Sequence, residues 1–422
     1  MALLGPMLMV AESSAADLAD VLGKAGAFPI AQTRWADVPA AIAETQPVAI
    51  AIADPQVTPS PTQLSAAIES IEMRGGPVTP VISVIDASSI PAIPGALPIA
   101  VNECPDRLIA RLRWALRIRT LHATALRRSR ASGPNKVFTF MPPNLLEETA
   151  VLCVARGGSY PVLSAPIGER AGLIGALSIE TAARYLNARD VDAVIIGEGL
   201  GPGVGEALLT LVASDTRFQD LPVGVLNNAA ADDKRLVNLV RAEGDPVRLV
   251  ECILPLARLH AFEARLARAL KSLESEGAID PNTGLLVAQV FWRKLERAIQ
   301  ESQETGVALS IARFTFEGIA DGRAYVDAAR LFTRLGRNTD LACQEQDGSI
   351  LAAFAKTDLR SAHLLARQIA SVLKHTMLSP SDDRRVIKPT ITLAAVKPAD
   401  DLSTLVARLG APVKVAAERG RD

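Results

Sequence analysis

Short, uninterrupted apolar runs alternate with amphipathic stretches over the first 125 residues. The predicted strands are Met7–Val10, Val48–Ala53, Val81–Ile85 and Ile99–Val101. The predicted helices are Ser13–Ala25 and Asp106–Arg127. Strands that are apolar at every position are typical of parallel sheets covered by helices on both faces. This pattern predicts an α/β domain.

A second series of the same kind follows a connector at Arg127–Pro134, whose basic, Ser/Gly/Pro-containing composition is typical of a solvated linker. The predicted strands are Lys136–Phe140, Tyr160–Leu163, Ala193–Ile196 and Pro222–Leu226. The predicted helices are Asn144–Arg156 and Gly205–Ser214. We therefore expect two successive α/β domains.

Composition narrows the classes of function. A chain of 422 residues has room for several domains. Its 45 basic and 46 acidic residues provide no basic field for a nucleic-acid polymer or an anionic membrane. The apolar start is interrupted by Gly5 and Pro6 and predicts a strand rather than a signal peptide, and no apolar run is long enough to cross a bilayer.

The cysteines show no C-x-x-C spacing, and the histidines are scattered. These patterns predict reduced core thiols in a cytoplasmic protein and no metal site. The residues concerned are Cys104, Cys153, Cys252, Cys343, His122, His260, His363 and His375.

Arg337 and Asp340 form an R-x-x-D pattern that can recognise a purine nucleotide. An arginine presents a planar fork of donors to a phosphate or to the O6/N7 edge of guanine, and an aspartate accepts hydrogen bonds from the guanine N1–H and N2–H₂ groups. The alternative is an ordinary surface turn, because the spacing alone is a weak signal.

The pattern precedes Gln346-Asp347-Gly348-Ser349-Ile350, and together they resemble the centre of a GGDEF (diguanylate cyclase) domain. In that family the R-x-x-D pair is the allosteric site for cyclic di-GMP, and the five-residue hairpin reads G-G-D/E-E-F. The resemblance implies that Arg337 and Asp340 bind cyclic di-GMP. Arg367, beside the position at which the family has a supporting arginine, is the third candidate ligand residue.

The resemblance extends over the whole C-terminal segment, from Asp280-Pro281-Asn282-Thr283-Gly284 to Arg421. It places Ala312 and Phe314 where the family has its two metal-binding aspartates, and Val287 where it has the asparagine that reads guanine. Ser349 replaces the hairpin acid. A methyl group and a phenyl ring cannot hold Mg²⁺. The resemblance therefore implies no catalytic residues, no metal and no enzymatic activity.

Both N-terminal series resemble receiver domains. A working receiver needs an acidic pair after its first strand and an acceptor aspartate after its third; here only Glu12 follows the first strand. Asp54 is a candidate phosphoacceptor, and the alternative is a polar residue at a strand end. In the second series the acceptor position is Gly197 and the acid pair is replaced by Phe140 and Met141, which excludes phosphotransfer there.

Two further patterns each leave two interpretations. The glycines between Gly197 and Gly205 suggest a phosphate cradle, but their spacing favours a flexible loop. Leu259, Phe262 and Leu266 belong to a helical repeat that could pair with a second copy of the chain or lie against its own domain.

We expect a receiver-like (flavodoxin-like, parallel-sheet) domain at 1–128, a second at 136–258, a connecting helix at 259–277 and a GGDEF-like α+β domain at 278–422. This order resembles PleD-type cyclases and, with a degenerate hairpin, PopA-type cyclic di-GMP effectors. That likeness implies a homodimeric cytoplasmic effector, located at a cell pole, that recruits a proteolysis adaptor in cell-cycle control. The alternatives are a structural dimerisation scaffold and a residually active cyclase.

Overall fold

The computed structural model describes residues 4–13, 15–54, 59–72, 76–86, 89–131, 149–201, 203–226, 235–317, 322–337, 339–376 and 388–410. The chain divides into two compact units. The first comprises Met1–Ala183 and Val191–Ala267, and the second comprises Arg184–Asp190 and Arg268–Asp422.

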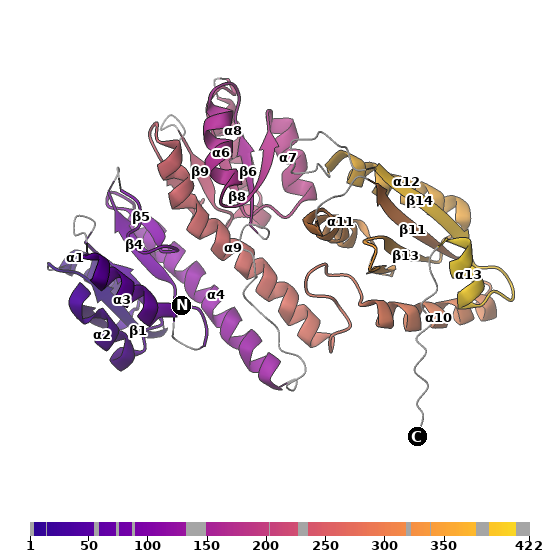
Figure 1. Cartoon of the computed structure of the whole chain (residues 1–422), viewed down its shortest axis with the longest axis horizontal. Coiled ribbons are helices and arrows are strands. Elements are labelled where there is room, and N and C mark those ends of the chain that lie inside the picture. The colour runs from indigo at the N-terminus through magenta and orange to yellow at the C-terminus, as the bar shows by residue number, and fades with distance from the viewer. Residues whose placement is uncertain are drawn as a thin grey trace. The chain divides into compact units, whose positions relative to one another are not determined.

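The first part of the first unit is a five-stranded parallel sheet of order β2-β1-β3-β4-β5, the order of flavodoxin-like folds. It is drawn in indigo and violet in Figure 1. Its strands are β1 (Leu4–Val10), β2 (Phe28–Thr33), β3 (Ala49–Ile52), β4 (Val81–Ile85) and β5 (Leu97–Ala100). Its helices are α1 (Ala16–Lys24), α2 (Val38–Thr45), α3 (Pro61–Glu72) and α4 (Pro105–Ala131), with a 3₁₀ turn, η1, at Trp35–Asp37. The prediction of a parallel α/β domain is confirmed, although the strand at Phe28–Thr33 was missed.

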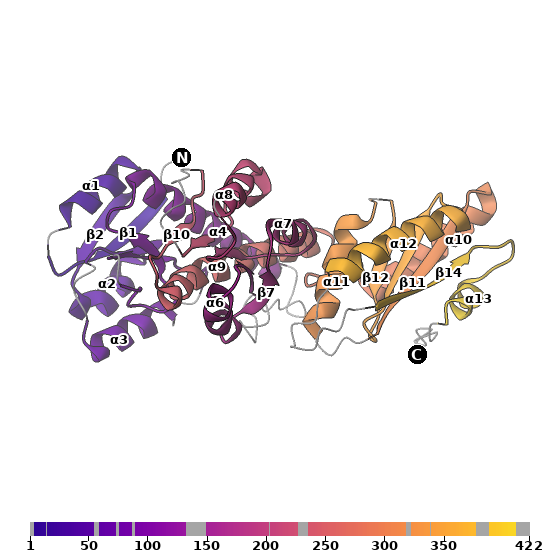
Figure 2. The same cartoon turned by 90° about the horizontal axis from the view of Figure 1, so that it is seen from above.

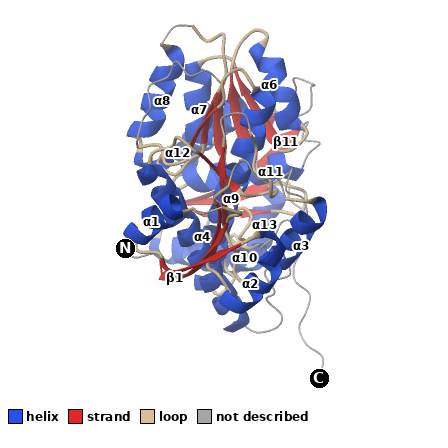
Figure 3. Ribbon diagram, turned by 90° about the vertical axis from the view of Figure 1, so that its left-hand side faces the viewer, coloured by secondary structure: helices blue, strands red, loops and turns tan. Residues whose placement is uncertain are grey.

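The second part repeats that strand order as β10-β9-β8-β6-β7, with helices on both faces (Figure 3). Its strands are β6 (Ala150–Val154), β7 (Gly172–Ala176), β8 (Ala193–Ile196), β9 (Val223–Val225) and β10 (Leu239–Arg241). Its helices are α6 (Ser159–Gly168), α7 (Ile179–Ala188), α8 (Val204–Ser214) and α9 (Pro246–Glu274), with η2 at Thr216–Phe218.

Two predictions in this part were wrong. The expected helix Asn144–Arg156 contains the buried strand β6, and the expected strand Tyr160–Leu163 lies inside α6. Short apolar runs fit either structure by periodicity alone. β6 pairs with β7 on one side and β8 on the other, and the residues that follow it are Ala155 and Arg156.

Phe140, Met141 and the expected strand Lys136–Phe140 lie outside the described residues. Gly197 follows β8 directly, as expected of the acceptor position. α4 extends to Ala131, into the segment predicted to be a connector.

The second unit contains a four-stranded antiparallel sheet of order β12-β13-β11-β14 (Figure 2). Its strands are β11 (Leu309–Glu317), β12 (Leu341–Gln344), β13 (Ile350–Ala355) and β14 (Lys388–Ala395). Its helices are α10 (Ala288–Thr305), α11 (Gly322–Leu335), α12 (Leu359–Thr376) and α13 (Leu402–Arg408). The mixed α/β architecture is thus as predicted, and Phe291, Leu295 and Ile299 form the buried face of α10.

Among the described residues, none of the helices combines the length and the apolar character that a bilayer crossing requires.

Candidate functional site

The R-x-x-D segment forms a tight turn between α11 and β12. The Asp340 amide donates to the Arg337 carbonyl at 3.0 Å, and the Arg337 amide donates to Asp340 Oδ2 at 3.2 Å. An aspartate that accepts from a nearby backbone amide stabilises such a turn. The local sequence therefore fixes the backbone from which both candidate ligand side chains project.

The two side chains differ in exposure. Arg337 is exposed, and its backbone rather than its guanidinium makes the contacts with Asp340. Asp340 is half-buried, and its Oδ1 atom is buried without a hydrogen-bond partner. Arg337 can reach a ligand in this conformation, whereas Asp340 must rotate outward to offer both oxygens.

Burial raises the pKa of the Asp340 carboxyl, and the backbone amide and charge of Arg337, together with the backbone amide of Ala355, offset part of the increase. The pKa of Asp340 is thus higher in the folded state than in the unfolded state, where it is about 3.9. Below that pH the protonated carboxyl contributes its full stabilisation, and this contribution is lost as the pH rises through the folded-state pKa. The ionised carboxylate is therefore held in an unfavourable environment at neutral pH.

We expect Asp340→Asn to raise the free energy of unfolding at pH 7, because the amide resembles the protonated acid and keeps an acceptor for the Arg337 amide. The gain should shrink as the pH falls and Asp340 itself becomes protonated. Urea unfolding at several pH values measures both effects. Asp358→Asn is the matched control, because hydrogen bonds from Ser361 lower the pKa of Asp358 and its replacement should give no gain. A less stable Asp340→Asn variant at pH 7 would contradict this interpretation.

The third candidate, Arg367, lies on the exposed face of α12, opposite the buried Ala366 and Ala370. Within the part of the chain that the structure describes, no hydrogen bond or ion pair joins Arg367 to Arg337 or Asp340. The structure therefore brings Arg337 and Asp340 together in one turn, but it shows no contact between Arg367 and either of them.

The two positions at which the GGDEF family has metal-binding aspartates lie in the hydrophobic core of this chain. Ala312 and Phe314 of β11 are fully buried, and Phe314 makes an edge-to-face contact with Phe332 of α11 at 5.2 Å between ring centroids. Their neighbours in this core include Ala352 and Phe354 of β13. No group of three or more His, Cys, Asp or Glu side chains able to hold a metal occurs among the described residues.

The turn that precedes β13 has no room for an acid at its third position. Gly348 has φ +80°, which disfavours other residues, and a Cβ atom there would overlap the ring of Tyr325 from α11. At the next position, Ser349 is buried and donates its hydroxyl to Asp347 Oδ1 at 2.6 Å. Asp347 is thus the sole carboxylate between Gln346 and Ile350.

Arg313, which the sequence analysis did not single out, binds this carboxylate. Its Nη2 donates to Asp347 Oδ2 at 2.6 Å, its Nε to Ser349 Oγ at 3.3 Å and its Nη1 to the Gly410 carbonyl at 2.7 Å. Partial burial of the Asp347 carboxyl acts to raise its pKa, but the hydrogen bonds from Ser349 and Arg313 outweigh this effect and lower the pKa. The positive charge next to the Asp347 carboxylate is therefore the guanidinium of Arg313. A charged residue between the apolar Ala312 and Phe314 was the signal that could have identified it.

In the first sheet, Asp54 follows β3, and its Oδ2 accepts a hydrogen bond from Ser13 Oγ at 3.0 Å. Glu12, the single acid after β1, accepts a hydrogen bond from the Trp35 amide at 3.0 Å. The position of Asp54 at the carboxyl edge of a parallel sheet suits a phosphoacceptor, and this role stays a prediction.

No family profile matches the chain, and no curated protein sequence matches it. Several solved structures do. The coiled coil and GGDEF domain of DgcB from Caulobacter crescentus, in complex with c-di-GMP, is 18% identical with a TM-score of 0.30, covering 35% of this chain and 83% of that one. The FimX GGDEF domain from Pseudomonas aeruginosa is 14% identical with a TM-score of 0.29, covering 32% and 89%.

Diguanylate cyclase SiaD from Pseudomonas aeruginosa, in complex with its activator SiaC, is 18% identical with a TM-score of 0.30. The match covers 35% of this chain and spans 60% of the SiaD chain. Identities and TM-scores this low support no statement about the function of this chain.

Proposed function

We propose that this chain is a catalytically inactive, GGDEF-like effector that binds cyclic di-GMP through Arg337 and Asp340. The observation that carries the proposal is the contrast between two neighbouring sites. The turn keeps an exposed guanidinium and a carboxylate with an unsatisfied buried oxygen, whereas the metal positions beside it are filled by Ala312 and Phe314.

The chemistry of the pair favours a guanine-phosphate ligand. The guanidinium of Arg337 can bind a phosphate or the Hoogsteen edge of guanine in a bidentate way. Asp340, once rotated outward, can accept from guanine N1–H and N2–H₂, and these bonds would satisfy an oxygen that the protein leaves without a donor. In this proposal Arg367 contributes a second cation from α12.

Ligand binding can signal only if the ligand favours one conformation over another. We propose that the rotated Asp340 defines the bound state and that this state alters a protein-binding surface. The partner in this proposal is a proteolysis adaptor recruited at a cell pole, and the active species is a homodimer. The alternative functions are a scaffold that binds no nucleotide and a cyclase with residual activity.

We expect no cyclic di-GMP to form from GTP in the presence of Mg²⁺ or Mn²⁺, because Ala312 and Phe314 offer no carboxylate to a metal and Asp347 is paired with Arg313. Product analysis by chromatography measures turnover, with an active diguanylate cyclase assayed in parallel. Isothermal titration of the same preparation with cyclic di-GMP measures binding. Synthesis of the product would overturn the inactive assignment, and a lack of binding would support the scaffold.

A further inference from the structure

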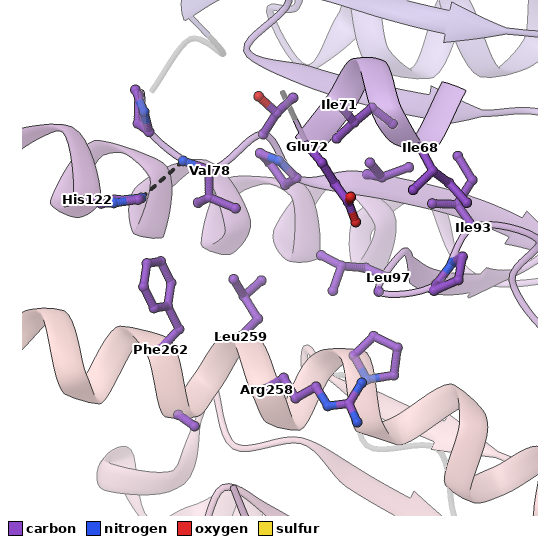
Figure 4. Close-up of a pocket in the computed structure, with 18 of the residues that line it drawn as sticks. Ile68, Ile71, Glu72, Val78, Ile93, Leu97, His122, Arg258, Leu259 and Phe262 are labelled. Atoms are coloured by element: carbon purple, nitrogen blue, oxygen red, sulfur yellow. Dashed lines mark hydrogen bonds between the residues drawn. The ribbon is translucent and has the colours of Figure 1, made fainter. Parts of the chain in front are cut away.

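Within the first unit, a pocket of about 750 Å³ lies between the first sheet domain and α9 (Figure 4). Leu259 and Phe262 of α9 face Ile68, Ile71 and Leu97 from the sheet domain across it. Small-molecule sites typically have volumes of roughly 300–1,000 Å³ and predominantly apolar walls. In size and lining, the pocket is suited to a ligand with an apolar body.

Hydrogen bonds and ring packing hold one wall of the pocket in place. The Val78 amide donates to His122 Nδ1 of α4 at 3.0 Å, and Arg119 Nη1 donates to the carbonyls of Pro77 and Val78 at 2.9 and 2.8 Å. The ring of His122 makes an edge-to-face contact with Phe262 at 5.0 Å between centroids. This wall is preorganised, which lowers the cost of ordering it around a ligand.

His122 contributes no charge to the pocket. Its Nδ1 atom accepts a hydrogen bond and is therefore unprotonated, and burial together with the nearby charge of Arg119 lowers its pKa. The charged residues of the lining are Arg258, Arg265 and the exposed Glu72. Both arginines of the lining belong to α9, so the cationic side of the pocket is this helix.

Arg258 is the residue that most needs an acceptor. Its Nε atom is buried without a hydrogen-bond partner, and its Nη2 makes one long contact of 3.4 Å to the Arg170 carbonyl. No ion pair joins it to a carboxylate in the described ranges of the chain. A guanidinium has five N–H donors, and leaving such donors unsatisfied in a partly buried position is unfavourable.

We propose that this pocket binds a medium-chain organic carboxylate, with the alkyl chain between α9 and the sheet domain and the carboxylate at Arg258. Such a ligand satisfies the unpaired guanidinium and removes apolar surface from water in one step. The site is independent of the R-x-x-D turn, which lies in the other unit. Its occupancy is therefore tested separately from cyclic di-GMP binding.

Isothermal titration of the full chain with decanoate, decanol and decylamine, each below its critical micelle concentration, tests the proposal. We expect decanoate to bind about tenfold more tightly than decanol, because a charge-assisted hydrogen bond contributes a factor of this order. Decylamine should bind more weakly than either. Equal affinity for decanoate and decylamine, or no binding of decanoate, would overturn the proposal.

Two variants locate the ligand. Arg258→Met keeps much of the side-chain volume, so it should reduce the affinity for decanoate about tenfold and leave that for decanol unchanged. Retained decanol binding shows that this variant is folded. Ala261→Phe, which fills the pocket, should abolish binding of both compounds. Arg293→Met, at an exposed position on α10, is the matched control and should bind decanoate normally. Unchanged decanoate affinity in Arg258→Met would refute the site.

Discussion

Arg337→Ala is expected to weaken cyclic di-GMP binding at least about 100-fold without unfolding the protein. The guanidinium can make two charge-assisted hydrogen bonds to the ligand, each contributing about 1.5–3 kcal/mol, and about 1.4 kcal/mol corresponds to a tenfold change in affinity. Because Arg337 is exposed, its truncation should change stability by less than about 0.5 kcal/mol. Isothermal titration with cyclic di-GMP and urea unfolding measure the two effects.

Arg360→Ala is the matched control for this experiment, because Arg360 is an exposed arginine of the same unit at the start of α12. It should bind cyclic di-GMP like the unaltered chain. Arg337→Lys should give an intermediate affinity, since lysine retains the charge but lacks the planar fork. Full affinity in Arg337→Ala would show that the turn is not the ligand site.

Arg111→Met is expected to destabilise the first unit by about 1–3 kcal/mol, because it leaves buried backbone carbonyls without their hydrogen-bond donor. Arg111 of α4 is 1% exposed, and desolvation lowers its pKa to about 10, so it stays protonated at neutral pH. Its guanidinium donates to the Pro98 carbonyl of β5 and, at 3.1 Å each, to the carbonyls of Val237 and Leu239 near β10. One side chain therefore links the edges of the two parallel sheets.

Urea unfolding followed by tryptophan fluorescence measures this effect, because the buried Trp114 lies on the same helix and donates to Glu263 Oε2 of α9 at 2.9 Å. Arg113→Met, at an exposed position two residues further along α4, is the control and should leave the unfolding midpoint unchanged. Equal midpoints for the two variants would show that the carbonyl contacts of Arg111 contribute little.

The contacts of α9 decide between two interpretations that its sequence left open. The repeat of Leu259, Phe262 and Leu266 is compatible with pairing to a second copy or with packing against its own domain, and α4 belongs to the other sheet domain of the first unit. In the structure Phe262 contacts His122, and Glu263 accepts from Trp114 and Arg117, so this face lies against α4 (Figure 1). A helical repeat reports which face is apolar, but it does not identify what covers that face.

The errors in the second parallel sheet have a similar origin. Ala150–Val154 is short, apolar and buried at every position, and such a run fits a buried helix turn as well as a central strand. Pairing with β7 and β8 decides the outcome, because those partners supply the backbone hydrogen bonds that a strand cannot make alone.

The sequence by itself determined that apolar runs alternate with helices, and with it the α/β class of the first unit, because those patterns depend on local periodicity. It also determined that positions 312 and 314 of β11 carry no carboxylate, since this follows from the residue types alone. Only the tertiary structure decided that Arg313 pairs with Asp347, that Tyr325 covers Gly348 and that Asp340 keeps one oxygen unsatisfied. These features join residues from different elements, and their energies depend on distance and burial, which a linear pattern does not contain.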